Sequence, residues 1–185
     1  MALMKAVALL IFLPVLASGE SLDTRLLERI HTGWESRHLT QIMEKTTVLG
    51  QAEVGLGLCL ILSTYGSEKE KETGKLGFTS LALTGPVVSG LKYAVGRERP
   101  YEKTSRANSS FPSGHAAAVF AVSSVIASEY PRLKIPAYVV AGAVAFSRVY
   151  LGRHYPSDVI VGSAVGYGIG KLVYAKRKPI LALTF

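Results

Sequence analysis

Five long apolar segments, separated by short polar connections, constrain this chain more than any other feature. None of them alternates polar and apolar residues with a period of two, so strands are not favoured. Their lengths are adequate or slightly short for crossing a bilayer core of about 30 Å. The last three carry almost no charge between their ends, whereas a buried helix of a soluble protein usually shows a polar stripe. The pattern predicts an all-α, integral-membrane helical bundle with about five transmembrane helices, and a soluble helical bundle is the rival. The segments cover about residues 46–65, 76–95, 115–130, 135–151 and 158–174.

The first 19 residues have the pattern of a secretory signal peptide. Lys5 precedes a short apolar core, and small residues follow at positions 17–19. The core is short for a spanning helix. We therefore expect residues 1–19 to be a signal peptide and residues 20–185 to form a single domain. If residues 1–19 are retained, they add a sixth transmembrane helix.

Residues 21–45 place apolar side chains at helical spacing, with charged residues on the other face. This predicts an N-terminal amphipathic helix that lies in the membrane interface and is broken near Ser36.

The distribution of positive charge predicts an orientation. The net charge is +8, but the cations are scattered between apolar runs, which disfavours nucleic acid as a partner. The connections at residues 66–75 and 132–134 and the tail at 171–178 would lie on one side of five spans, and they are rich in Lys and Arg. This is the expectation for the cytoplasmic side. The other connections then face outward.

Small residues repeat at every fourth position in the last apolar segment, as Gly162, Gly166 and Gly170. Such spacing lets helices approach closely, and we expect it to serve packing inside the bundle.

Three stretches at the outward ends of the apolar segments carry groups that suit phosphate chemistry. In KYAVGRERP (92–100), Lys92 and Arg99 lie seven positions apart and would share a helix face if the helix continued. Arg97 would face elsewhere, and we interpret it as an ordinary basic residue at the membrane edge. In FPSGH (111–115), Ser113 and Gly114 precede a new helix, whose free amides bind phosphate oxygens. His115 follows directly.

The third stretch, SRVYLGRHYPSD (147–158), contains a further cation and a His–Asp pair. Arg148 ends one apolar segment, and His154 and Asp158 lie four residues apart where the next begins. Asp158 can accept a hydrogen bond from one imidazole nitrogen and leave the other free to attack. A pair that merely caps a helix is the structural alternative.

Together, Lys92, Arg99 and Arg148 supply three positive charges for a phosphate dianion, with two histidines to divide the roles of nucleophile and acid. No Asp, Glu or His cluster has convincing ligand spacing, so we expect no metal and no other cofactor. Cys59 is the one cysteine and lies in an apolar run, where we expect it to pack.

These three stretches resemble the signatures of the type 2 phosphatidic acid phosphatase superfamily: Lys-x6-Arg-Pro, Pro-Ser-Gly-His and Ser-Arg-x5-His-x3-Asp. All three match in order. The resemblance implies a metal-independent phosphatase with a phosphohistidine intermediate. By it, His154 is the nucleophile, Asp158 orients it, and His115 protonates the leaving oxygen. The phosphate would be held by Lys92, Arg99, Ser113, Gly114 and Arg148.

Hydrophobicity and size make the chain similar to the bacterial membrane lipid phosphatases of that superfamily. The expected partners are the bilayer and a phosphorylated lipid: lipid A 1-phosphate, undecaprenyl diphosphate, phosphatidylglycerophosphate or phosphatidic acid. The expected location is the bacterial inner membrane, with the site facing the periplasm or the outside. Two alternatives remain open: a soluble periplasmic acid phosphatase of the same superfamily, and a non-catalytic lipid-phosphate binder or transporter.

Overall fold

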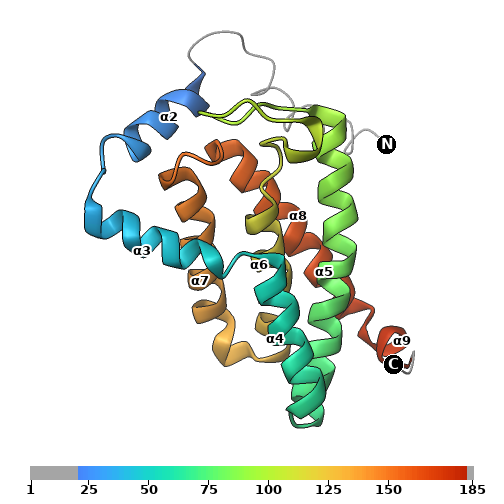
Figure 1. Cartoon of the computed structure of the whole chain (residues 1–185). Helices are drawn as coiled ribbons and strands as arrows, with labels where there is room; N and C mark the ends of the chain where they lie inside the picture. Colours follow the sequence, from blue (N-terminus) through green and yellow to red (C-terminus); the bar gives the residue numbers. More distant parts are fainter. Residues whose placement is uncertain (1–20, 183–185) are drawn as a thin grey trace.

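The computed structural model describes residues 21–182, and this part of the chain contains helices and no strand (Figure 1). The all-helical prediction is therefore confirmed for these residues. The predicted signal peptide lies outside the described residues. The α-helices are α2 (Leu22–His31), α3 (Arg37–Val48), α4 (Ala52–Tyr65), α5 (Glu68–Val95), α6 (Gly114–Glu129), α7 (Lys134–Tyr150), α8 (Pro156–Ala175) and α9 (Arg177–Ala182).

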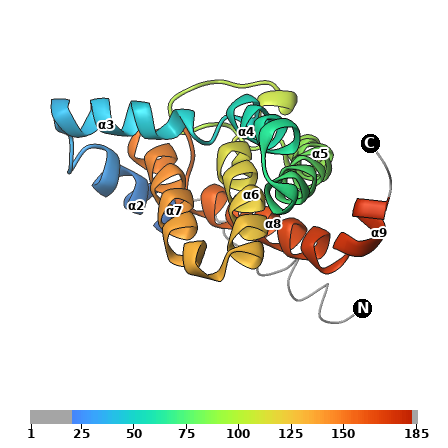
Figure 2. The same cartoon turned by 90° about the horizontal axis from the view of Figure 1, so that it is seen from below.

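Helix α6 lies at the centre of the bundle. It contacts α4, α5, α7 and α8, and Figure 2 shows it between α7 on one side and α4 and α5 on the other. Its closest neighbour is α8, because glycines on α8 face the α6 backbone. A Cβ atom at Gly166 would lie 2.0 Å from the Ala117 carbonyl oxygen, and one at Gly162 would lie 2.4 Å from that of Ser113. The predicted packing role of these glycines is confirmed.

The connections separate to the two ends of the bundle. The α5–α6 and α7–α8 connections lie at one end, together with α2, while the α4–α5 and α6–α7 turns lie at the other (Figure 1). The three stretches singled out in the sequence therefore meet at one end. The Lys- and Arg-rich residues 66–75 and 132–134 lie at the opposite end, as predicted.

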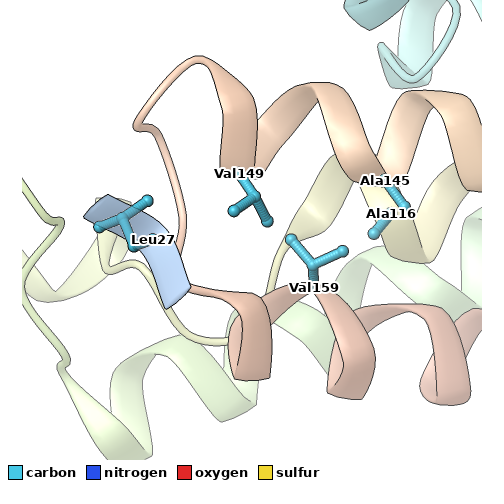
Figure 3. Packing of buried hydrophobic residues seen from close by; sticks show 5 residues of the cluster. All are labelled: Leu27, Ala116, Ala145, Val149 and Val159. Atoms are coloured by element: carbon cyan, nitrogen blue, oxygen red, sulfur yellow. The ribbon is translucent and has the colours of Figure 1, made fainter. Parts of the chain in front are cut away.

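The N-terminal amphipathic segment forms two helices with a break before Arg37, in agreement with the break predicted near Ser36. Helix α2 packs across the end of the bundle. Its Leu27 is 2% exposed and belongs to a buried cluster with residues of α6, α7 and α8 (Figure 3). Helix α3 packs against α7. Tyr150, the last residue of α7, contacts the break: its hydroxyl group accepts a hydrogen bond from the Ser36 amide at 3.3 Å.

The prediction of a loop over residues 66–75 was wrong, because α5 already begins at Glu68. The Glu70 carboxylate accepts hydrogen bonds from the Ser67 amide at 2.7 Å and the Ser67 hydroxyl at 2.8 Å. This contact satisfies the backbone at the helix start and lets the charged residues continue as helix.

The apolar segments at 76–95, 115–130, 135–151 and 158–174 each lie almost wholly within one helix, but the first segment, 46–65, is divided by the break between α3 and α4. The number of transmembrane helices remains a prediction. Within residues 21–182, no helix alone combines the length and the apolar character needed to cross a membrane. Helices α3 and α4 meet that requirement only as a pair, bent by 52° at the break between them.

Candidate functional site

The predicted site residues are brought to one end of the bundle by four helix termini. Lys92 lies in the last turn of α5 and Arg148 in that of α7, whereas His115 and Asp158 lie in the first turns of α6 and α8. Electrostatic interactions link His115 to three cations and to the other histidine of the site. These partners are Lys92, Arg99, Arg148 and His154.

His154 lies in the α7–α8 connection and is only 2% exposed. Its Nδ1 atom is 2.7 Å from the carbonyl oxygen of Ser110. Because a carbonyl oxygen only accepts hydrogen bonds, Nδ1 must carry the proton in the neutral ring. The lone pair is therefore on Nε2, the nitrogen that a nucleophilic role requires.

Asp158 is fully buried. Contrary to the prediction from the sequence, it makes no direct hydrogen bond to His154. Its Oδ2 atom is 3.8 Å from His154 Nδ1, which is too far for a hydrogen bond. Instead, Oδ2 accepts hydrogen bonds from the Ser110 hydroxyl and, at 2.9 Å, from the Tyr155 amide. Asp158 therefore acts on His154 through its negative charge and by fixing Ser110, whose carbonyl binds the imidazole.

Arg97 was predicted to face away from the site, and this is wrong. Its guanidinium donates hydrogen bonds at 2.8 Å to Asp158 Oδ1 and to Asp23 Oδ2 of α2. It also lies over the Tyr155 ring, 3.9 Å from the centroid. Asp23 is 5% exposed and accepts a 2.9 Å hydrogen bond from the Ser157 amide. Helix α2 is thus tied by ionic contacts to the residues around His154.

Burial lowers the pKa of His154 below its ordinary value of 6.5, while Asp158 opposes this shift and the positive charges of Arg148 and Arg99 add to it. Burial dominates because the charged imidazolium loses its hydration. His154 is therefore neutral at neutral pH and has a free lone pair.

Lys92 and Arg99 come together, but not along one helix face. Helix α5 ends at Val95, and Gly96 adopts a left-handed conformation with φ of 63°, which suits glycine. The chain then turns back. Lys92 donates to the Ser109 carbonyl oxygen, and Arg99 donates to the Asn108 side chain at 2.8 Å. Both cations are thus held by the segment that precedes α6.

Two predicted phosphate ligands have buried polar atoms with no hydrogen-bond partner among the described residues: Ser113 Oγ and Arg148 Nε. Ser113 is completely buried and Arg148 is 8% exposed. The Ser113 side chain does not cap α6, although the residue is at the N-cap position. The Arg148 side chain is partly fixed, since its Nη1 donates to Thr47 Oγ1 at 2.8 Å. Such groups are costly to bury unless a ligand binds them.

Gly114 is the first residue of α6, so its amide belongs to the unpaired set at that helix start. The Ser113 amide, by contrast, donates to the Asp158 carbonyl oxygen at 2.9 Å. This bond joins the second and third motif stretches directly.

The sequence alone does not single out Ser110, Asp23 or Thr47. Ser110 directly precedes FPSGH, and Asp23 follows the Ser21 cap of α2, so neither had a motif neighbour that set it apart. Their contacts reach across 44 to 134 residues of sequence, which local spacing does not reveal. Within residues 21–182, no group of three or more His, Cys, Asp and Glu side chains is arranged to hold a metal.

The model of the PAP2 superfamily matches residues 75–180. The chain is 40% identical over 98 residues to the lipid A 1-phosphatase of Porphyromonas gingivalis, and the match covers 51% of this chain and 21% of that protein. It is 38% identical over 101 residues to that of Rhizobium etli, covering 48% of this chain and 44% of the relative. The chain thus spans less than half the length of these relatives. It is also 31% identical over 139 residues to the undecaprenyl-diphosphatase of Sulfolobus acidocaldarius, covering 63% of this chain and 68% of the relative.

Two crystal structures share the fold. One is the transmembrane PAP2-type phosphatidylglycerolphosphate phosphatase of Bacillus subtilis, with a TM-score of 0.75, 22% identity, and coverage of 99% of this chain and 98% of that one. The other is LpxE of Aquifex aeolicus, with a TM-score of 0.72, 24% identity, and coverage of 84% and 96%.

Proposed function

Because the chain belongs to the PAP2 superfamily, we propose that it is a membrane phosphatase that hydrolyses the phosphomonoester or diphosphate headgroup of a lipid, without a metal, through a phosphohistidine intermediate. The observation that carries this proposal is the pair of buried, unpartnered donors, Ser113 Oγ and Arg148 Nε, among three cations and two histidines. A phosphate group supplies the acceptor oxygens and the negative charge that these residues lack.

The first step is an attack of His154 Nε2 on phosphorus. A nitrogen–phosphorus bond forms while the bond from phosphorus to the leaving oxygen breaks. His115, in its protonated form, gives its proton to that oxygen. The imidazole of His154 becomes positively charged, and the buried Asp158 carboxylate stabilises this charge.

The second step returns the enzyme to its starting state. His115, now neutral, takes a proton from a water molecule that attacks phosphorus. The nitrogen–phosphorus bond breaks, its electron pair returns to Nε2, and inorganic phosphate leaves. In both steps Lys92, Arg99 and Arg148 stabilise the charge on the transferring phosphoryl group, which is usually the largest catalytic contribution.

The relatives and the apolar helices support a lipid as the substrate class. We include lipid A 1-phosphate, undecaprenyl diphosphate, phosphatidylglycerophosphate and phosphatidic acid, because the phosphate ligands do not distinguish among them. We place the protein in the bacterial inner membrane, with the site facing the periplasm. The Lys- and Arg-rich connections at the other end of the bundle support this orientation.

The test is release of inorganic phosphate from each of the four lipids by detergent-purified protein in the presence of EDTA. We expect turnover of at least one lipid, and a loss on the order of 10⁴- to 10⁶-fold in His154→Ala, as for other nucleophiles. Full activity of His154→Ala would refute the proposed nucleophile. Lipid binding without any turnover by the wild type would instead identify a lipid-phosphate binder, and recovery of the active protein in the aqueous fraction without detergent would identify a soluble phosphatase.

A further inference from the structure

His115 borders a pocket on the side of the site formed by α4 and α5. This His115 pocket has a volume of about 300 Å³. Polar side chains from the start of α4 and from α5 contribute to its wall beside the first residues of α6. Its polar lining residues are Gln51, Glu53, Thr84, Ser89 and His115, and the rest of the wall is glycine and apolar side chains.

A second cavity of about 320 Å³ lies between α4, α6 and α7, and we call it the α4–α7 groove. Its wall is almost wholly apolar and runs from Leu49, near the α3–α4 break, to Leu133, where α7 begins. The His115 pocket and the α4–α7 groove share three lining residues, Gln51, Leu81 and Ala118. The two cavities therefore adjoin, and an apolar path leads from His115 toward the far end of the bundle.

Phosphoryl transfer defines which side of the site receives the leaving group. The attacking atom and the leaving oxygen lie roughly in line through phosphorus. If His154 attacks, the leaving oxygen lies on the opposite side of the phosphoryl group, next to the acid His115. We infer that the His115 pocket holds the polar part of the leaving group and that the α4–α7 groove holds a hydrocarbon chain of the phosphorylated lipid. This inference rests on the proposed function.

The walls of the two cavities fit these two parts of a lipid. Ligand sites are mostly apolar, with a few polar groups that orient the ligand. Gln51, Glu53 and Ser89 offer such groups beside His115, and the groove beyond them offers Val54, Leu58, Val122 and other apolar side chains.

Gly50 brings the α3–α4 break close to His115. A Cβ atom at this position would lie 2.5 Å from Val144 Cγ1 and 3.1 Å from His115 Cβ. Because glycine lacks this atom, the α3–α4 break packs directly against His115. The start of α4 is also where the pocket and the groove join, at Gln51.

Two neighbouring valines on α7 provide a matched test. Val140 lines the groove, whereas Val139 is 64% exposed and is not among the groove-lining residues. The experiment measures kcat/KM for a long-chain alkyl phosphate and for ethyl phosphate in Val140→Trp, Val139→Trp and the wild type. In Val140→Trp the indole fills part of the groove, so the ratio of the long-chain to the ethyl value falls about tenfold relative to the wild type. Val139→Trp keeps the wild-type ratio.

An unchanged ratio in Val140→Trp, or an equal fall in Val139→Trp, would overturn the assignment of the groove. A chain-length series on the wild type, from ethyl to octyl phosphate at fixed detergent concentration, covers the case in which the indole prevents folding. We expect kcat/KM to rise about twofold per added CH₂, because the groove wall is itself partly exposed, with Val140 44% exposed, and each CH₂ is therefore only partly buried. A flat series would refute the inference even though phosphatase activity is present. Absence of turnover for every ester and every lipid would instead refute the proposed function itself.

Discussion

Arg97 is the residue whose removal should disturb the site most without touching the phosphate. In Arg97→Met, the 5% exposed Asp23 and the fully buried Asp158 both lose their cation. Breaking a buried ion pair by removing one partner costs about 3–5 kcal/mol, because the remaining charge is left uncompensated. We expect the free energy of unfolding to fall by about this amount, measured by denaturant titration in detergent. Since Asp158 also loses one of its three fixed donors, kcat should fall about 100-fold.

A double-mutant cycle separates the two ion pairs of Arg97. Asp23→Asn keeps the Arg97–Asp158 contact and should cost only about 1–3 kcal/mol. The double variant leaves one buried carboxylate unpaired instead of two, so its cost should be lower than the sum of the single costs by at least about 1 kcal/mol. Arg97→Lys retains the charge but not the guanidinium fork that spans both carboxylates. Relative to Arg97→Met, it should recover more of the free energy of unfolding than of kcat. If Arg97→Met unfolds like the wild type, or if the costs add, the buried network described above does not exist.

Further predictions concern helix packing, pH and the phosphate ligands. Gly166→Ala should destabilise the protein by about 1–3 kcal/mol, because the new Cβ meets the Ala117 carbonyl oxygen. Gly168→Ala, with no atom within 4 Å of its Cβ, should be neutral or stabilising by up to about 1 kcal/mol. Equal thermal unfolding midpoints of the two variants would contradict this prediction. The acid limb of kcat/KM, where His154 takes up a proton and loses its lone pair, should lie below pH 6.5 because burial lowers that pKa. A limb above pH 6.5 would show that the imidazole is not desolvated. Ser113→Ala should raise the inhibition constant of inorganic phosphate about tenfold. The free energy of unfolding should stay equal or rise, since the substitution removes a buried, unpartnered hydroxyl. Unchanged inhibition by phosphate would show that Ser113 is not part of the site.

The helical framework and the meeting of the three motif stretches could be predicted from sequence because both depend on local patterns. Apolar runs define the helices, and alternating direction along the chain places every second connection at the same end. The start of α5 was misjudged because its first turns are charged, and only the Ser67–Glu70 capping contact shows that helix begins there.

The contacts around His154 were harder to predict. A spacing of four residues suggests a direct His154–Asp158 hydrogen bond, but the Ser110 carbonyl oxygen occupies that position. Extending α5 through residue 99 places Arg97 at the membrane edge, away from the site, whereas Gly96 ends the helix and turns the chain inward. In both cases a distant segment competes with the local geometry, and its position is known only from the fold.

The most direct test of the central claim is to find the covalent intermediate. Detergent-purified protein is mixed with a lipid carrying radiolabelled phosphate, quenched rapidly at alkaline pH, digested and analysed by mass spectrometry. We predict that the phosphoryl group is found on His154 and that His154→Ala carries no label. Label on another residue, or turnover by His154→Ala at the wild-type rate, would contradict the account.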